Sequence, residues 1–294
     1  MSSNPSLGRE DVPERSNRLG LDGLEFIEYT TSQPQALGQV LEKLGFRPVA
    51  RHRSREVLLY RQGSMNLVVN ASADAGETPV ISAVALRVRD ALQAYQRCLD
   101  LGAWSVPSHA QAMELHIPAI HGPGGSRFYF VDRWKEFSIY DIDFTPIPSV
   151  DPHPPALAGM GYFGVVQYIG YQRSTDWITY FERMFDFRLL PDEERFGILP
   201  KGKLMRSPCG GFLWQLIEPD PGMYADLDSD PRPECLQRIG LGTPDVGQAV
   251  RLLKEQGVEF VESSRMHPDD RGALTRNALG TVAFELVHRD SGRS

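Results

Sequence analysis

The stretch LQRIGLGTPDVGQAVRLLKEQGV, residues 236–258, decides the fold, because it joins a half-apolar strand to an amphipathic helix across a short polar break. Alternation along residues 236–245 places Arg238 among apolar and small side chains that are typical of a core. Apolar residues recur every three or four positions along residues 246–258, which predicts a helix with one buried stripe. A guanidinium inside such a strand needs a partner on a neighbouring strand.

The same strand–helix pattern occurs four times in the chain. The pairs are 24–31 with 34–46, 81–90 with 91–103, 162–170 with 175–187, and 236–245 with 246–258. Each pair is followed by further strand-like runs, such as EVLLYRQGSMNLVVN (56–70) and TVAFELVH (281–288). The repeat predicts an α+β fold of four βαβββ units.

The proline-rich stretch PIPSVDPHPPALAGM, residues 146–160, divides the four units into two pairs. Proline cannot donate to a strand ladder, so this stretch is expected to be a linker. We therefore predict a disordered polar tail over residues 1–20, a first domain over 21–145 and a second domain over 161–290. Each pair of units is expected to form an open β-barrel, whose mouth is a typical small-molecule site.

Composition limits the class of protein. The 294 residues carry a net charge of −7, with 41% hydrophobic residues, which is typical of a globular protein and does not favour a nucleic-acid partner. No apolar run approaches the roughly 20 residues that cross a bilayer, and the N-terminus lacks the apolar region of a signal peptide. Cys98, Cys209 and Cys235 have no CxxC spacing and are expected to be reduced thiols of a cytoplasmic protein. Homo-oligomerisation is left open.

Several motifs of the first half resemble one enzyme family. They are GLDGLEFIEY (20–29), RHRSREVLLYRQGSMNLVVN (51–70), MELHIPAIHGPGGSRFYFVDR (113–133) and FSIYDIDF (137–144). They are similar to the N-terminal domain of the 4-hydroxyphenylpyruvate dioxygenase family, within the vicinal oxygen chelate (glyoxalase/bleomycin resistance/dioxygenase) superfamily. The resemblance implies a dioxygenase of aromatic metabolism.

The second half resembles a related domain more closely. Its motifs are RFGILPKGKLMRSPCGGFLWQLIEPD (195–220) and HPDDRGALT (267–275). They are similar to the dioxygenase-like domain that is fused to some bacterial 3-dehydroshikimate dehydratases. The dehydratase barrel of those fusions has no counterpart in these residues, so dehydratase activity is not expected.

The resemblance also implies where a metal site would lie. Family members hold ferrous iron with two histidines and one glutamate in the C-terminal barrel, which leaves positions open for a 2-oxo acid and dioxygen. Phe163 or Gly164 stands at the first histidine position, and Arg238 stands at the second. Only the glutamate is kept, as Glu285, and a guanidinium has no lone pair to offer a metal. The resemblance thus implies a degenerate site without a cofactor; the alternative is Fe(II) or another divalent metal, with Glu285 as a ligand.

The equivalent positions of the first barrel, by matching the repeats, are Gly23, Ala83 and Tyr129. None of these is a typical iron ligand. The first barrel is therefore expected to be structural.

Arg238 and Glu285 are expected to face each other on neighbouring strands. A buried carboxylate is costly unless it is paired, and a guanidinium is a suitable partner. Three interpretations stay open. The two residues form a structural ion pair, or Arg238 binds a substrate carboxylate while Glu285 anchors it or acts as a base, or an unusual metal site survives.

Further residues are candidates for ligand binding in the second barrel. They are Phe163, Gln167, Arg206, Ser207, Gln215, Gln237 and His267. The resemblance suggests Gln215 and Gln237, whereas strand alternation predicts that Gln237 points away from Arg238. Lys201, Lys203 and Arg206 form either an anion-binding rim or a solvated hairpin.

The predicted function is a 4-hydroxyphenylpyruvate dioxygenase-like protein with a degenerate iron site, which binds or transforms a small acidic or aromatic metabolite in the second barrel. One alternative is a genuine Fe(II)-dependent 2-oxo acid dioxygenase with substitute ligands. The other is a non-catalytic accessory module for a dehydroshikimate dehydratase. Whether the protein is an enzyme stays open at this point.

Overall fold

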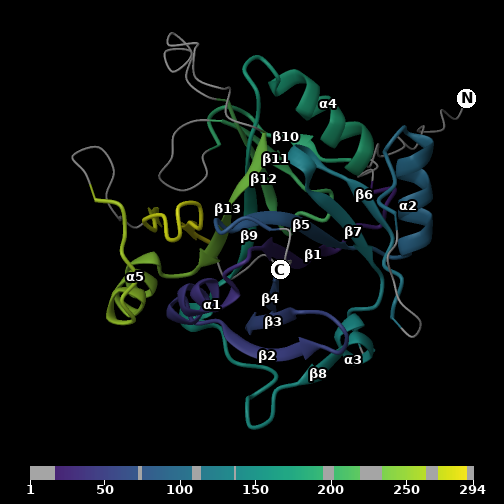
Figure 1. The fold of residues 1–294 in the computed structure, drawn as a ribbon. Coiled ribbons are helices and arrows are strands. Elements are labelled where there is room, and N and C mark those ends of the chain that lie inside the picture. Colours follow the sequence, from purple (N-terminus) through teal and green to yellow (C-terminus); the bar gives the residue numbers. More distant parts are fainter. Residues whose placement is uncertain are drawn as a thin grey trace, which may run out of the picture.

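Two open β-sheets, packed back to back and flanked by helices, make up the protein (Figure 1). The computed structural model describes residues 17–71, 75–107, 114–135, 137–194, 202–218, 234–262 and 271–289. Within these ranges no helix is long and apolar enough to cross a membrane.

The first sheet has eight strands in the order β6-β7-β5-β1-β4-β3-β2-β8. They are β1 (Gly23–Thr30), β2 (Arg47–His52), β3 (Val57–Gln62), β4 (Met65–Asn70), β5 (Val80–Arg87), β6 (Ala119–His121), β7 (Arg127–Val131) and β8 (Phe144–Pro146). The helices of this half are α1 (Pro34–Lys43), α2 (Ala91–Asp100), the short 3-10 helix η1 (Pro123–Gly125) and α3 (Ile139–Asp143).

The second sheet has seven strands in the order β10-β11-β12-β9-β13-β15-β14. They are β9 (Gly161–Tyr168), β10 (Arg188–Leu189), β11 (Lys203–Arg206), β12 (Leu213–Ile217), β13 (Cys235–Thr243), β14 (Gly272–Leu274) and β15 (Phe284–His288). The helices of this half are η2 (Leu157–Gly159), α4 (Ser174–Phe185) and α5 (Val246–Glu255).

The fourfold repeat is confirmed in its strand–helix pairs, β1–α1, β5–α2, β9–α4 and β13–α5. In each unit the first strand pairs in parallel with the last, and the two units of a half join antiparallel through β1–β5 or β9–β13. Units one and three carry three strands after the helix, as expected. In units two and four the first of these is reduced, among the described residues, to the single bridges Ser105–Ile120 and Phe260–Thr275.

The expectation of two barrels is met only in part, because the described strands form two open sheets. The first sheet is lengthened by β8, which returns from the second unit to pair with the edge strand β2 of the first. The prediction of a mixed α+β fold is confirmed, with two halves that are each mostly β-sheet.

Local sequence explains where the helices begin. Asp90 precedes α2 and accepts a hydrogen bond from the backbone N–H of Gln93 at 2.8 Å. Asp245 precedes α5 and accepts one from the N–H of Gln248 at 2.7 Å. An aspartate in this position satisfies a backbone N–H that the helix leaves free. Asp90 and Asp245 therefore mark the starts of α2 and α5.

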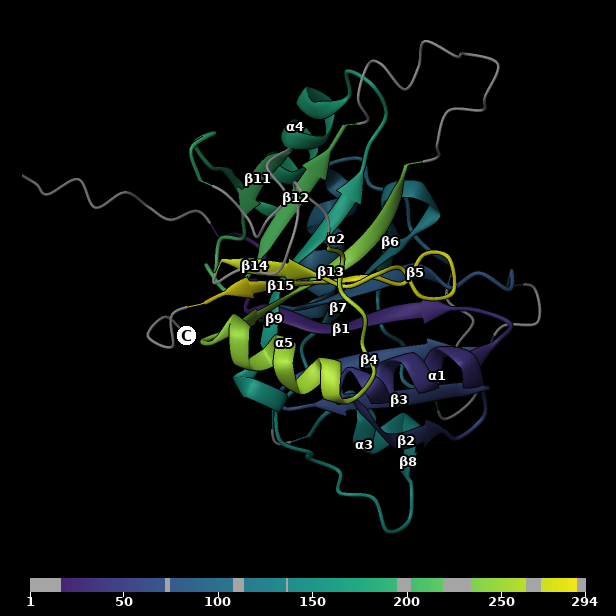
Figure 2. The same ribbon diagram turned by 90° about the vertical axis from the view of Figure 1, so that its left-hand side faces the viewer.

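One hydrophobic core joins the two halves. β5 and β13 lie close together, so the sheets meet by their backs. Helices of opposite halves lie side by side, α1 beside α5 and α2 beside α4 (Figures 1 and 2). Phe128 of β7 packs in the core with its ring 5.0 Å from that of Phe185 on α4 and 5.6 Å from that of Trp214 on β12.

The opposite face of each sheet carries a smaller apolar cluster of its own. We name the two the N-terminal inner face and the C-terminal inner face. The first is formed by Phe26, Val49, Leu59, Val68, Ile139, Tyr140, Phe144 and their neighbours. The second is formed by Val166, Leu190, Leu204 and Val287, with Phe163, Tyr168, Leu213 and Ile217 packed against them. Because the sheets meet back to back, the two inner faces point away from each other.

The segments expected as tail and linker make specific contacts. Residues 1–16 lie outside the described residues, but Leu19 is buried in the main core and Arg18 forms an ion pair with Asp186. The folded part therefore begins before residue 21, because Leu19 completes the apolar core. In the linker, the carbonyl of Pro154 accepts a hydrogen bond from the N–H of Gly63 at 2.8 Å.

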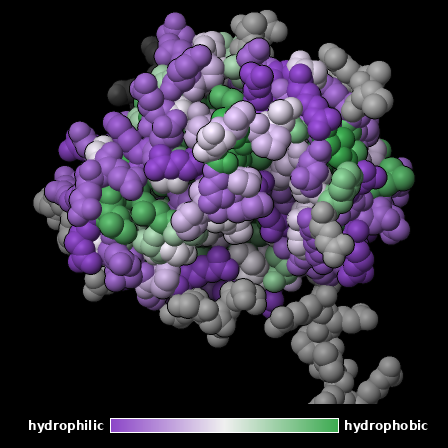
Figure 3. All heavy atoms as spheres, turned by 90° about the horizontal axis from the view of Figure 1, so that it is seen from below, coloured by the Kyte–Doolittle hydropathy of each residue, from purple (hydrophilic) through white to green (hydrophobic). Residues whose placement is uncertain are grey.

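The surface seen in Figure 3 is mainly hydrophilic, with hydrophobic residues in separate patches. Single exposed hydrophobic residues, such as Leu92 and Trp104, are ordinary on globular proteins. The cysteines Cys98, Cys209 and Cys235 are free thiols.

Replacement of Phe128 by alanine tests whether one core joins the halves. The ring is 1% exposed, and its loss is expected to lower the free energy of unfolding by about 3–5 kcal/mol. The matched control is Phe137→Ala, since Phe137 is 61% exposed and should cost about 0.5 kcal/mol or less. Urea denaturation followed by circular dichroism measures both. A cost below about 1 kcal/mol for Phe128→Ala would contradict the shared core.

Candidate functional site

The C-terminal inner face brings Arg238 and Glu285 together on neighbouring strands. Strand β13 pairs with β9 on one side and with β15 on the other. Gly164, Gly240 and Glu285 lie in one row across these three strands. Arg238 lies two residues before Gly240, on the same face, opposite Val166.

Arg238 is a buried cation with three neighbours. Its Nε lies 3.5 Å from Oε2 of Glu285, and the two side chains are 5% and 0% exposed. Its Nη1 donates to Oε1 of Gln237 at 3.0 Å and to the hydroxyl of Tyr168 at 3.4 Å. The Arg238–Glu285 contact expected from the sequence is thus present.

Two nitrogens of the guanidinium, Nε and Nη2, make no hydrogen bond within the described residues, but Nε lies within ion-pair distance of Glu285. Nη2 of Arg238 is buried and has no hydrogen-bond partner among the described residues. A buried donor without a partner costs about 1–3 kcal/mol, so this nitrogen is where an acceptor from a ligand would be favoured.

A β-bulge corrects the prediction for Gln237. The pairing of β13 with β9 shifts register between Leu236 and Arg238, so Gln237 is an extra residue without a partner opposite it. Simple alternation would turn its side chain away from Arg238, whereas it accepts a hydrogen bond from the guanidinium. The bulge also sends Leu236 into the core between the sheets, away from the face of Arg238.

Strand register distinguishes Phe163 from Gly164. Gly164 pairs with Gly240, whereas Phe163 falls at a second register shift and packs on the C-terminal inner face. In the first sheet the row equivalent to Gly164, Gly240 and Glu285 is Phe26, Ala85 and Tyr129. The predicted equivalent Gly23 is therefore three residues away from Phe26. Ala83 lies two residues before Ala85, as Arg238 lies two residues before Gly240, and Tyr129 corresponds to Glu285, so these two predictions agree with the pairing.

The remaining predicted binding residues divide between the two faces of the sheet. Gln215 is buried on the C-terminal inner face, opposite Val166. Gln167 points into the core between the sheets, where its Oε1 accepts a hydrogen bond from Nε1 of Trp214 at 2.9 Å. Gln167 is therefore not brought to the site, because neighbouring residues of a strand face opposite sides.

The hairpin of β11 and β12 carries the other predicted residues. Ser207 is buried in its turn, where its hydroxyl accepts a hydrogen bond from the N–H of Phe212. Arg206 and Lys203 are paired with Glu194 at 3.1 Å and Asp192 at 2.8 Å. Their charges are thus compensated by carboxylates, which favours a solvated hairpin over an anion-binding rim. His267 and Lys201 lie outside the described residues.

The donor set does not fit ferrous iron. Of the three positions that the resemblance suggested, Gly164 has no side chain, Arg238 is a cation and only Glu285 could be a ligand. The guanidinium also lies within ion-pair distance of that carboxylate. No group of three histidine, cysteine, aspartate or glutamate residues in the described part of the chain could hold a metal.

A cavity on the N-terminal inner face was not foreseen from the sequence. Its volume is about 200 Å³, and its lining includes Phe26, Glu28, Val68, Arg127 and Tyr129. The sequence signal was present in LEFIEYTT, where alternation turns Glu28 inward. The metal-ligand positions of the first sheet do not include this residue, so they do not point to the cavity.

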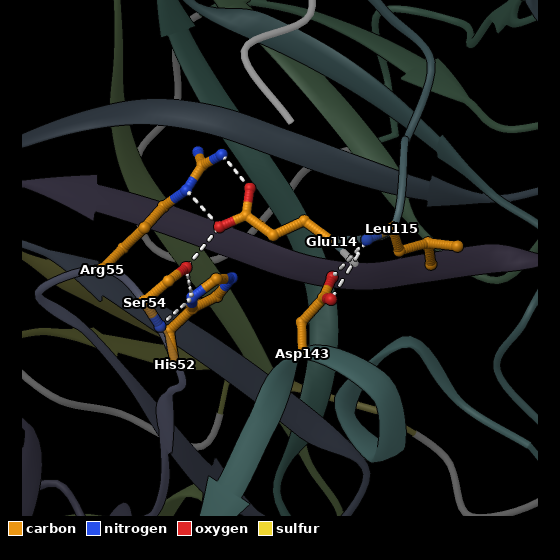
Figure 4. A network of polar contacts seen from close by, with 6 residues as sticks. All are labelled: His52, Ser54, Arg55, Glu114, Leu115 and Asp143. Atoms are coloured by element: carbon orange, nitrogen blue, oxygen red, sulfur yellow. Dashed lines mark hydrogen bonds and ion pairs between the residues drawn. The ribbon is translucent and has the colours of Figure 1, made fainter. Parts of the chain in front are cut away.

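A polar network forms one side of this cavity (Figure 4). Glu114 pairs with Arg55 and accepts a hydrogen bond from the hydroxyl of Ser54. Nδ1 of His52 accepts a hydrogen bond from the N–H of Ser54 at 3.3 Å. Burial lowers the pKa of His52, so the ring is neutral near pH 7.

Comparison with known proteins identifies similar chains. The family model described as "Hydroxyphenylpyruvate dioxygenase, HPPD, N-terminal" matches residues 15–145. A 4-hydroxyphenylpyruvate dioxygenase of Pseudomonas sp. (strain P.J. 874) is 42% identical over 83% of this chain and 72% of its own length. A 3-dehydroshikimate dehydratase of Pseudomonas aeruginosa is 32% identical over 86% of this chain but 42% of its own length.

Among solved structures, a fusion protein of a xylose isomerase-like TIM barrel and a 4-hydroxyphenylpyruvate dioxygenase matches the fold. Its TM-score is 0.72 at 24% sequence identity, and the match covers 93% of this chain and 50% of the fusion chain. This likeness shows the fold alone.

A double-mutant cycle tests the buried ion pair. Arg238→Ala removes the guanidinium from a fully buried carboxylate and is expected to lower the free energy of unfolding by about 3–5 kcal/mol. Arg238→Ala combined with Glu285→Ala should cost less than the sum of the single changes by about 1 kcal/mol or more. Arg206→Ala, in an exposed ion pair, is the control and should cost about 1 kcal/mol or less. Additive costs in urea denaturation would show that the two residues do not interact.

Proposed function

The chain belongs to the 4-hydroxyphenylpyruvate dioxygenase family, and we propose that it is a member with a degenerate iron site that binds a small aromatic acid through Arg238. The observation that carries this proposal is the unused Nη2 of Arg238 on the C-terminal inner face. A carboxylate is the ligand group that a guanidinium binds best, because two parallel N–H groups match its two oxygens.

The surroundings of Arg238 support an aromatic acid. Tyr168 lies with its ring 5.9 Å from the guanidinium, and Phe163 packs on the same face. These rings can pack against an aromatic ligand. The relative from Pseudomonas sp. is named for 4-hydroxyphenylpyruvate, a compound with one ring and one acid group.

Glu285 has the role of a positioning residue in this proposal. Its carboxylate holds Nε of Arg238 at 3.5 Å and so orients the remaining N–H groups. A charge of opposite sign also offsets the cost of keeping a guanidinium buried before the ligand arrives. The proposed role is binding without oxygenation, because the residues do not fit ferrous iron.

The likeness to a 3-dehydroshikimate dehydratase favours a second candidate function. In that protein the matched region is less than half of the chain. The second candidate is an accessory module that binds a dehydratase partner, in line with the dioxygenase-like half of the solved fusion. Co-purification with a separately encoded dehydratase would support it.

Titration of phenylacetate into the whole chain tests the proposed site. We expect binding measurable by isothermal titration calorimetry, and an affinity about 10–100 times weaker in Arg238→Gln, which loses a charge-assisted hydrogen bond. Phenylacetamide keeps the size but not the charge, so it should bind weakly to both proteins. Arg188→Gln, on the edge strand β10, is the control and should bind phenylacetate as the unchanged chain does. Equal affinities for the acid and the amide would argue against the role of Arg238.

Metal analysis after anaerobic purification with ferrous iron tests the degenerate site. The unchanged chain and Arg238→His are both expected to hold far less than one iron per chain, because Gly164 supplies no ligand. Gly164→His together with Arg238→His would restore two histidines beside Glu285, and this variant should bind iron. Near-stoichiometric iron in the unchanged chain, with oxygen consumed on addition of 4-hydroxyphenylpyruvate, would instead establish a dioxygenase with substitute ligands.

A further inference from the structure

The cavity on the N-terminal inner face has the size and the walls of a binding site for one ring. Its volume is about 200 Å³. A cavity of about 150 Å³ is known to hold benzene when its walls are apolar. Much of the lining is apolar, including Phe26, Val57, Val68, Ile139 and Phe144. A single aromatic ring would therefore fit among these side chains.

Glu28 presents an unused oxygen to this cavity. Its side chain is 8% exposed and lines the cavity. Oε1 is saturated: it accepts hydrogen bonds from Arg127 at 2.8 Å, Ser82 at 2.9 Å, Asn70 at 3.3 Å and Thr30 at 3.4 Å. Oε2 accepts none from the residues that the structure describes. A carboxylate oxygen that borders a cavity and has no donor from the protein favours a ligand with a hydrogen-bond donor.

The charges around the cavity disfavour an anionic ligand. Arg127 is already paired with Glu28, and Arg55 with Glu114. Asp143 adds a third carboxylate, which accepts a hydrogen bond from the N–H of Leu115 at 3.1 Å. A ligand carboxylate would thus meet three carboxylates and two guanidiniums that are both engaged.

The cavity also disfavours a ligand that carries a full positive charge. An ammonium group loses its water in a largely apolar cavity, which costs more than the same step for a hydroxyl. Burial raises the pKa of Tyr129, so its phenol stays neutral and adds a donor and an acceptor to the wall. A neutral donor therefore suits this site best.

We infer that this cavity is a second ligand site, which binds an uncharged single-ring phenol with its ring among Phe26, Val68 and Phe144 and its hydroxyl donating to Oε2 of Glu28. The site lies on the opposite side of the molecule from Arg238. It requires neither Arg238 nor a metal, so it stands or falls independently of the function proposed for the C-terminal inner face.

Calorimetric titration of the whole chain with phenol and with toluene tests the inference. The two compounds have the same shape, but only phenol can donate a hydrogen bond. Phenol should bind with a dissociation constant of about 1 mM or tighter. In Glu28→Gln the side-chain amide keeps the size but loses the charged acceptor, so the ratio of phenol affinity to toluene affinity should fall about tenfold.

Two further variants complete the test. Val68→Phe fills the cavity and should abolish binding of both compounds, with circular dichroism confirming that the variant is folded. Glu42→Gln changes an exposed glutamate of α1 and should leave both affinities unchanged. Phenylacetate binding should be the same in Glu28→Gln as in the unchanged chain, which separates the two sites. Absence of phenol binding, or an unchanged affinity ratio in Glu28→Gln, would overturn the inference.

Discussion

The pairing of β13 between β9 and β15 is the constraint on which the C-terminal half depends. Antiparallel pairing with β9 and parallel pairing with β15 place Arg238 and Glu285 on one face. A guanidinium and a carboxylate that are both buried must compensate each other, because burying either charge without the other would carry a large desolvation cost. The same pairing sends Ile239 and Leu241 to the back of the sheet, where they help to join the two halves.

The two inner faces show how one repeat can carry different buried polar groups. In the second sheet the buried cation Arg238 has its charge balanced by Glu285. In the first sheet Ala83 and Tyr129 stand at the corresponding positions, and the polar group is Glu28, opposite Ala83. Glu28 is paired with Arg127 and also lines the cavity of this face.

The sequence predicted the elements and the repeat well because those depend on local periodicity and on capping residues such as Asp90 and Asp245. It predicted the Arg238–Glu285 contact because two copies of a repeat must superpose. It did not predict the position of Gln237, since a bulge adds one residue to a strand and reverses alternation beyond it. It did not predict the cavity either, because empty space depends on how side chains from several strands and α3 fill a face.

The sequence by itself determined the family and the α+β repeat, since both follow from motifs and periodicity that lie along the chain. Only the tertiary structure decided that Gly164 pairs with Gly240, that Gln167 faces the core, and that Glu28 lines a cavity. These outcomes depend on strand register and on packing between distant segments, which local sequence patterns leave undetermined.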